Sequence, residues 1–468
     1  MPPVDHVEPT TIFANLRAVV AASMAQQGVP GAAVGVRLGD QEFVAGLGVT
    51  NVDHPQLVTP DTLFQIGSIT KTFVSLLVSK LVEEGKLDLD TRVRTYLPDF
   101  QVADEDVSAA VTIRHLLTHS AGWVGDFFID TGEGDDAAAR YVAQMRDLPQ
   151  LAPMDSHYSY NNASFYLLGR LIEVVTGTTF EQAMAELVFA PLGIDDAYFQ
   201  ASDVLVHRFA VGHATRDGVP FVATPWALPR AARAAGGIVT NVEMLLRYAK
   251  FQMGDGLNQN GDRVLGRASM ATMQTAHFPV WGDAEAVALS WFIDNRDGVG
   301  VLQHSGGTVG QVSLLVVIPE CQFALAIVTN GSQGGHVTRA AYRWCLTHFL
   351  GVEPKVPVPL AVARGELAEY EGTFSRPMAD LHLHIADDMG TPDEGRLRLE
   401  FRHKQGFPDA ATPPPPAPAP MTVAPCAPDR LLILDGFAKD SVIDVIRDAA
   451  GAVTYLRLGR LYARQHGA

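Results

Sequence analysis

The spacing of apolar residues changes several times along this chain. Residues 11–26 show a helical period, and two short β-rich runs follow at residues 31–39 and 42–51. Helical periodicity then dominates residues 68–247, and short β-like runs return at residues 286–330, before a last helix-like stretch. Strand patterns from both ends flank a helical middle, so we predict one antiparallel sheet built from N- and C-terminal parts of an α/β (α+β) domain.

The final hundred residues follow another pattern. Residues 353–366 are punctuated by proline and predict a linker. Residues 367–468 hold short candidate strands at regular spacing, the first at 367–374 and the last at 453–464, typical of a small sandwich or barrel. We therefore predict a first domain over residues 1–352, with a helical subdomain at roughly 75–235, followed by an all-β domain. The proline-rich stretch 408–428 predicts an exposed loop with polyproline character, serving either as an inert spacer or as a docking motif.

Composition narrows the class of function. The 468 residues are 47% hydrophobic and carry a net charge of −17, which argues against nucleic acid and anionic membranes, because both attract basic surfaces. The three cysteines, Cys321, Cys345 and Cys426, are an odd number without metal-ligand spacing, so they imply neither a disulfide framework nor a zinc site. The chain begins without a signal-peptide pattern and has no apolar run near the ~18 residues of a membrane span. We expect a cytoplasmic protein without a cofactor or metal.

The most informative stretch is Ser68-Ile69-Thr70-Lys71. The apolar period that follows predicts a helix with Ser68 in or near its first turn and Gly85 as its stop signal. Residues three apart share a helix face, so the Lys71 amine can reach the Ser68 hydroxyl, and the helix start favours negative charge there. This is the chemistry of a serine nucleophile with an adjacent base. A capping serine beside a solvated lysine is the alternative.

Two further motifs carry polar side chains at places suited to a cleft. Tyr160 and Asn162 precede a predicted helix, where Tyr160 could relay a proton and Asn162 could hold a substrate carbonyl, although an asparagine here also suits a helix N-cap. At the end of a predicted strand, His304 adds a polar or cationic group. Gly306 and Gly307 allow close approach of the backbone, so the Gly307 amide could join that of Ser68 in an oxyanion hole.

In this order, Ser-x-x-Lys, Tyr-x-Asn and His-x-Gly resemble the motif set of serine β-lactamases and penicillin-binding proteins. More specifically, the chain is similar to the class C-like branch with carboxylesterases, D-aminopeptidases and D-amino-acid amidases, in which the third motif is often His-x-Gly. The likeness covers about residues 12–350. One departure is His119-Ser120-Ala121-Gly122, where many relatives read His-Thr-Ser-Gly.

The resemblance implies an antiparallel sheet flanked by helices beside an all-helical subdomain, with the site between them. No glutamate of the class A deacylation kind is apparent, so efficient β-lactam turnover is not implied. The all-β domain resembles the lipocalin-like barrel appended to some of these hydrolases, which could cover the site, mediate oligomerisation or pack passively. The implied roles are Ser68 as acylated nucleophile, Lys71 as proton acceptor, Tyr160 as proton shuttle, Asn162 as substrate-positioning group, His304 as third wall, and the Ser68 and Gly307 amides as oxyanion hole.

The loop after Trp123 offers the clearest hint about substrate. It holds five acidic residues, beginning with Asp126, beside Phe127 and Phe128. If this loop borders the cleft, its carboxylates could attract a substrate amine, as in an aminopeptidase; the alternative is a solvated acidic loop. We therefore assign Trp123 and Asp126 to substrate binding as a hypothesis.

Three functions remain open at this point. The first is a serine hydrolase that cleaves small esters, amides or short peptides, including peptides with D-residues, through an acyl-enzyme. The second is an acyl transferase with the same machinery, such as a peptide-cyclising thioesterase of the penicillin-binding-protein type. The third is a non-catalytic scaffold that keeps the fold. A homo-oligomer is also compatible with the sequence.

Overall fold

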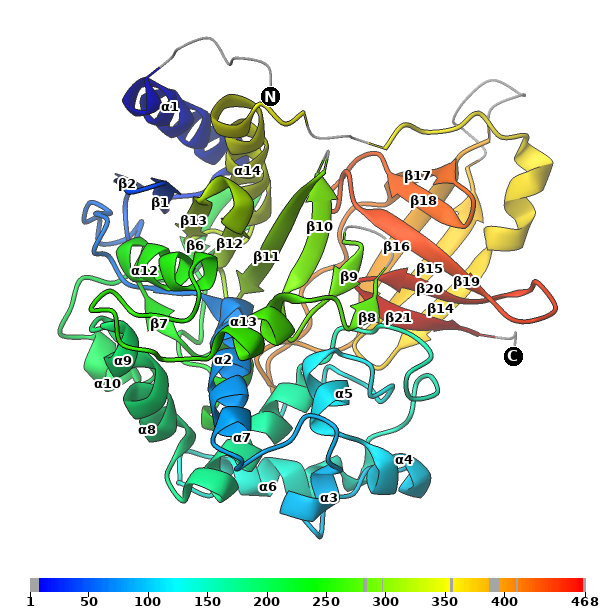
Figure 1. Ribbon diagram of the computed structural model, residues 1–468. Coiled ribbons are helices and arrows are strands. Elements are labelled where there is room, and N and C mark those ends of the chain that lie inside the picture. The colour runs from blue at the N-terminus through cyan, green and yellow to red at the C-terminus, as the bar shows by residue number, and fades with distance from the viewer. Residues whose placement is uncertain are drawn as a thin grey trace.

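The computed structural model describes residues 8–465, apart from residues 281–283, 297, 354–356, 387–394 and 410. Figure 1 shows three parts: a central sheet with helices on both faces, a helical block beneath it, and a closed barrel to the right of the sheet. The fold is β-lactamase-like, with a C-terminal antiparallel barrel. Among the described helices, none is both long and apolar enough to cross a membrane.

The central sheet joins the two ends of the first domain, as predicted. Its strand order is β2-β1-β13-β12-β11-β10-β9-β8, and β1 pairs with β13 from Ala32 opposite Thr329 to Leu38 opposite Phe323. All pairings in this sheet are antiparallel. The strands are β1 Gly31–Leu38, β2 Gln41–Gly48, β8 Phe278–Pro279, β9 Ala286–Val287, β10 Phe292–Arg296, β11 Val299–Gly307, β12 Val312–Ile318 and β13 Phe323–Thr329.

Helices cover the two faces of this sheet. On one face, α1 (Pro9–Gln27) and α14 (Gly334–Leu350) pack together over an apolar layer that includes Val34 and Ile327. The buried residues of α1 recur at helical spacing, and Gly28, with φ of 63°, ends the helix in the left-handed conformation. On the other face lie α2 (Thr70–Glu83) and α12 (Val242–Met253), within the largest core cluster.

The helical block also contains short strands. Its small sheet has the order β3-β7-β4, and a separate hairpin is formed by β5 and β6. The helices are α3 Val93–Tyr96, α4 Glu105–Ala110, α5 Ile113–Leu117, α6 Ala137–Gln144, α7 Ala163–Thr176, α8 Phe180–Met184, α9 Ala190–Leu192, α10 Ala201–Val204, α11 Arg233–Gly236 and α13 Arg267–Gln274. The strands are β3 Phe64–Gln65, β4 Ala197–Tyr198, β5 His213–Arg216, β6 Val219–Val222 and β7 Val239–Thr240.

The C-terminal part forms a closed barrel in the order β14 to β21. Closure leaves no unpaired sheet edge and encloses an apolar core of its own. The strands are β14 Gly372–Arg376, β15 Ala379–Ile385, β16 Leu397–His403, β17 Met421–Ala427, β18 Arg430–Ile433, β19 Val442–Arg447, β20 Val453–Leu458 and β21 Arg460–Arg464.

Three details of the barrel differ from the sequence-based expectation. The start of the first expected strand belongs to a 3-10 helix, Arg364–Tyr370. Strand β17 lies inside the range that we predicted as a loop, because Met421 and Val423 are buried in the barrel and Pro425 sits where the register shifts, a position that tolerates a missing N–H. The last expected strand is two strands, separated at Gly459, whose φ is 66°.

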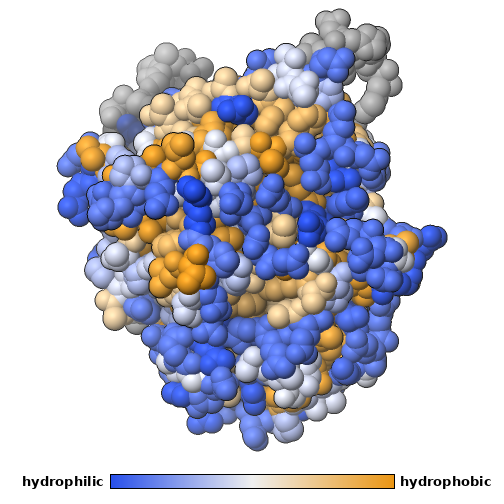
Figure 2. Space-filling model, turned by 90° about the vertical axis from the view of Figure 1, so that its left-hand side faces the viewer, coloured by the Kyte–Doolittle hydropathy of each residue, from blue (hydrophilic) through white to orange (hydrophobic). Residues whose placement is uncertain are grey.

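The surface is mainly polar. Figure 2 shows one side of the molecule, on which hydrophilic residues surround separate apolar patches. This agrees with the excess of acidic over basic residues, 52 against 35.

Candidate active site

Ser68 and Lys71 lie together where the chain enters α2. A short 3-10 helix, Gly67–Ile69, precedes α2, so Ser68 sits just before the α-helix rather than within its first turn. The Lys71 ammonium donates to the Ser68 hydroxyl at 3.0 Å. It also donates to the backbone carbonyl of Ala235 in α11. The serine and the predicted base are therefore in direct contact.

The Lys71 side chain has no solvent-exposed surface, and this sets its protonation. Burial lowers the pKa of Lys71 well below its usual value, and the positive charge of Arg460 lowers it further. The carboxylate of Asp126 acts in the opposite direction. A lysine whose pKa is lowered in this way is more readily present as the neutral amine that can accept a proton.

Tyr160 stands against the same amine. Its ring centroid is 5.1 Å from the Lys71 ammonium, and the ring stacks on His119 with centroids 4.5 Å apart. Burial raises the pKa of Tyr160 well above its usual value, while interactions with Ser68 and Arg460 oppose that rise. The phenol is therefore neutral at ordinary pH and can both donate and accept a proton.

Asn161 and Asn162, the two asparagines before α7, have different roles: one caps the helix and the other faces the site. Asn161 caps the helix, since its side-chain oxygen accepts the N–H of Ser164 at 2.9 Å. Asn162 is left to face the site, where its side-chain amide donates to Asp126 at 2.8 Å. Its carbonyl oxygen is then the atom suited to a substrate N–H.

The end of β11 forms the third wall, and glycines make its close approach to Ser68 possible. A Cβ at Gly67, whose φ is +52°, would lie 2.6 Å from the Gly307 amide nitrogen, and one at Gly306 would lie 1.9 Å from the Ile66 carbonyl oxygen. The Gly307 backbone therefore lies next to the segment that carries Ser68, as an oxyanion hole requires.

His304 is neutral rather than cationic. It is buried, and burial together with the nearby Lys71 lowers the pKa of His304 to about 3. Its Nδ1 is 2.6 Å from the Ser305 carbonyl oxygen, so Nδ1 carries the proton and donates. Of the two states that we expected for His304, polar or cationic, the structure favours the neutral polar one. The neutral ring presents Nε2 as a hydrogen-bond acceptor.

Asp126 joins the first domain to the barrel. Besides Asn162, it binds Arg376 at 2.7 Å and Arg460 at 2.5 Å. Burial alone would raise the pKa of Asp126, but the two arginines outweigh it and hold the pKa below its usual value. Attraction of a substrate amine by this carboxylate is therefore not favoured, because two guanidinium groups already neutralise it.

The hairpin between β20 and β21 reaches into the site. The Arg460 guanidinium lies 4.9 Å from the centroid of the Tyr160 ring, and the Tyr160 N–H donates to the Gly459 carbonyl at 3.1 Å. The Leu461 N–H donates to the Ser159 hydroxyl at 3.2 Å. We did not predict Arg376 or Arg460 as site residues from the sequence. The one local signal is Gly459, because a glycine at this position indicates a hairpin turn next to Arg460.

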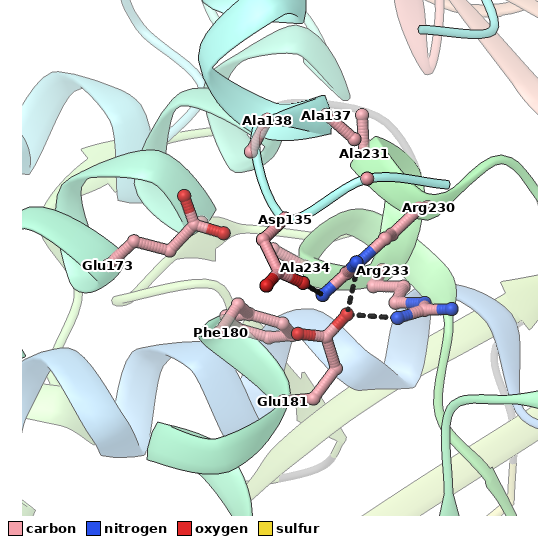
Figure 3. A pocket seen from close by; sticks show the side chains of 12 residues that line it. Asp135, Ala137, Ala138, Glu173, Phe180, Glu181, Arg230, Ala231, Arg233 and Ala234 are labelled. Carbon is pink, nitrogen blue, oxygen red and sulfur yellow. Dashed lines mark hydrogen bonds and ion pairs between the residues drawn. The ribbon is translucent and has the colours of Figure 1, made fainter. Parts of the chain in front are cut away.

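Two other acids of the loop after Trp123 pair with arginines at the start of α11: Asp135 with Arg230, and Glu133 with Arg233. Figure 3 shows Glu181 between Arg230 and Arg233, with Asp135 also directed at Arg230. The small cavity among these side chains, about 10 Å³, has room for roughly one water molecule. These ion pairs anchor the segment that carries Ala235, the residue whose carbonyl binds Lys71.

Trp123 takes a different place from the one expected. It is fully buried in the main core beside Phe100 and, among the described residues, is not part of the cavity lining. Its backbone carbonyl accepts a hydrogen bond from the Asn161 side chain at 3.0 Å. Trp123 therefore supports the loop from behind and does not reach the site.

Ser68 opens into a large cavity between the first domain and the barrel. Its volume is about 980 Å³, and its described lining includes Ser68, Tyr160, Asn162, His304, Gly306 and Gly307. Six arginines but only three aspartates line it, although the whole chain carries a net charge of −17. The cavity thus concentrates positive charge within an acidic protein and favours anionic groups. Among the described residues, no cluster of histidine, cysteine and acidic side chains could hold a metal ion.

We expect that Arg460→Met shifts the acid limb of the pH profile to higher pH. The arginine lowers the pKa of Lys71, so its loss raises that pKa, and the neutral amine then forms only at higher pH. The measurement is kcat/KM against pH for an uncharged ester, which reports on the free enzyme. Arg402→Met, an exposed barrel arginine, is the matched control and should leave the limb in place. A shift to lower pH would contradict the assignment.

Comparisons with known proteins agree with this geometry. The family model described as Beta-lactamase matches residues 16–347. Penicillin-binding protein 4 of Amycolatopsis lactamdurans is 35% identical over 382 residues, covering 80% of this chain and 98% of that protein. An unguisins hydrolase of Aspergillus campestris is 28% identical over 319 residues, covering 64% of this chain and 58% of that protein.

Solved structures show the same fold. The crystal structure of SurE has a TM-score of 0.74 at 24% identity, covering 97% of this chain and 99% of that one. A class C beta lactamase from Rhodobacter sphaeroides has a TM-score of 0.60 at 23% identity, covering 72% and 99%. Fold and site together define a serine hydrolase with a β-lactamase-like fold. The chain belongs to the beta-lactamase family.

Proposed function

We propose that this enzyme cleaves ester or amide bonds of short peptides through a covalent acyl-enzyme on Ser68. The observation that carries the proposal is the 3.0 Å contact between the Ser68 hydroxyl and a fully buried Lys71 amine, whose pKa is lowered by burial. A nucleophilic serine needs such a base, and a solvated lysine would not serve.

In this proposal, neutral Lys71 takes the hydroxyl proton while the Ser68 oxygen attacks the substrate carbonyl. The amides of Ser68 and Gly307 receive the developing oxyanion. Tyr160, neutral and beside Lys71, passes the proton to the leaving group. Water or an amine then attacks the acyl carbon and gives a proton to Lys71, and the bond to Ser68 breaks as Lys71 returns that proton to the Ser68 oxygen. Asn162 and the neutral His304 hold the substrate against β11.

The shape and charge of the cavity support a peptide substrate. Residues 302–307 of β11 pair with β12, whereas β10 pairs only as far as Gln303, so the edge next to Ser68 extends beyond β10. An extended peptide can lie along such an edge. The positive cavity favours an acyl donor that also carries a carboxylate. One of the relatives is named as a hydrolase, of unguisins, which agrees with a hydrolytic reaction.

Transfer of the acyl group to an amine is the second candidate. The barrel lines part of the cavity and places Arg460 over Tyr160, and in this proposal the barrel slows the attack of water on the acyl-enzyme. Slower hydrolysis gives an amine of the same peptide time to attack and close a ring. A non-catalytic scaffold is not favoured, because Ser68, Lys71 and Tyr160 are in contact.

Labelling of Ser68 tests the proposal. A fluorophosphonate should label the wild-type protein at Ser68, and Ser68→Ala should abolish both labelling and the hydrolysis of p-nitrophenyl esters. A protein that is folded but unlabelled would contradict acyl-enzyme chemistry. Incubation with a peptidyl thioester, followed by mass spectrometry, then separates linear acid from cyclic product and decides between hydrolysis and transfer.

A further inference from the structure

Two phenylalanines meet across the cavity from different domains. Phe128, in the loop after Trp123, and Phe407, in the connection between β16 and β17, have ring centroids 4.9 Å apart at an interplanar angle of 79°. Both line the cavity that contains Ser68. Edge-to-face contacts of this kind are favourable, and each ring keeps further apolar surface, since both side chains are only half-buried.

The loop around Phe128 fixes its direction. The preceding ring, Phe127, packs against the main core and lies 5.5 Å from the ring of Tyr141. The Tyr141 hydroxyl also donates to the Phe127 carbonyl at 2.7 Å. Because the chain is held at Phe127 from the core side, Phe128 turns to the cavity.

The barrel holds Phe407 just as firmly. A Cβ at the preceding Gly406 would lie 2.0 Å from the Thr412 carbonyl oxygen, so the loop closes tightly on itself at this glycine. Asp409 stabilises the turn by accepting the N–H groups of Ala411 and Thr412, each at 2.9 Å. The proline-rich connection therefore presents an aromatic ring to the site at a defined position.

Further apolar side chains belong to the lining of this cavity. Leu228, Met378 and Pro415 line the same cavity. We propose that Phe128 and Phe407 form a subsite for a bulky apolar side chain of the acyl donor. This inference rests on the proposed function and names the kind of substrate that it accepts: a peptide with a large aliphatic or aromatic residue near the reactive carbonyl.

Binding, measured apart from catalysis, tests the subsite. In a Ser68→Ala background, titration calorimetry should show N-acetyl-phenylalanine methyl ester binding about tenfold more tightly than N-acetyl-alanine methyl ester, with both enantiomers of each measured. Phe407→Ala or Phe128→Ala should bring this ratio below about threefold, and Phe407→Leu should leave an intermediate ratio. Phe437→Ala, an exposed phenylalanine of the barrel, should keep the full ratio.

The possible outcomes distinguish failure of the subsite from failure of the proposed chemistry. Unchanged affinity for the alanine ester shows that a variant is folded. Two results would overturn the subsite: an affinity ratio between the esters that is unchanged in both alanine variants, or equal binding of the two esters by the Ser68→Ala protein. Either result would count against the subsite even when wild-type Ser68 reacts with fluorophosphonate. Failure of that labelling would instead overturn the proposed chemistry while leaving the binding ratio measurable.

Discussion

Lys71→Met is expected to slow acylation of Ser68 by about 10³-fold, the size of effect typical of losing a general base. Methionine has a similar length and suits a buried position, whereas it cannot accept the proton of the Ser68 hydroxyl. The fold should persist, because the substitution removes a buried amine that costs free energy to desolvate. Stopped-flow measurement of the acylation burst with a p-nitrophenyl ester gives the rate directly.

Lys80→Met is the matched control for this prediction. Lys80 lies further along the same helix, partly exposed and 3.7 Å from Glu84, so its loss should change the acylation rate less than twofold.

The buried position of Lys71 also predicts how the acylation rate of the wild type depends on pH. Because the pKa of Lys71 is lowered, the neutral amine should form at a lower pH than that of a solvated lysine, and acylation should begin at correspondingly lower pH. An acylation rate that survives in Lys71→Met would assign the base elsewhere.

The sequence predicted the elements of this site that are local in the chain. Ser68 and Lys71 are separated by one turn, and the period of α2 was sufficient to place them together. The joining of β1 to β13 was also predictable, because both are short apolar runs flanking a helical region. In each case the structure depends on a pattern that spans only a few residues: either a spacing that puts side chains on one helix face, or an apolar run that forms a buried strand.

What could not be predicted is the contribution of the barrel. Arg376 and Arg460 lie 250 and 334 residues after Asp126, and neither stands in a pattern that distinguishes it from other arginines on strands. The same limit applies to the acidic loop: its carboxylates can be recognised in the sequence, but the arginines that pair with Asp135 and Asp126 come from the turn before α11 and from the barrel. The charge of a site depends on such pairings between distant segments, so it required the structure.

Asp126→Asn should destabilise the protein by about 3–5 kcal/mol, because it leaves the arginines Arg376 and Arg460 in the interface without their carboxylate. Asn162 would also lose the acceptor that orients its amide. Chemical denaturation, followed by intrinsic fluorescence, measures the loss. Asp130→Asn, in the same loop, is the control: Asp130 is exposed and accepts only the Gly132 N–H, so its effect should stay below about 0.5 kcal/mol.

Two further results would show that Asp126 stabilises the protein through its ion pairs rather than through packing. Adding Arg376→Met to Asp126→Asn should recover part of the lost stability, because one unpaired cation is removed. The folded pKa of Asp126 lies below its usual value of 3.8, so its stabilising contribution is present above that value and is lost as pH falls through the lower folded value. The wild type should therefore lose its advantage over Asp126→Asn in strong acid. An advantage that stays constant with pH, and no recovery in the double variant, would show that the carboxylate contributes through shape alone.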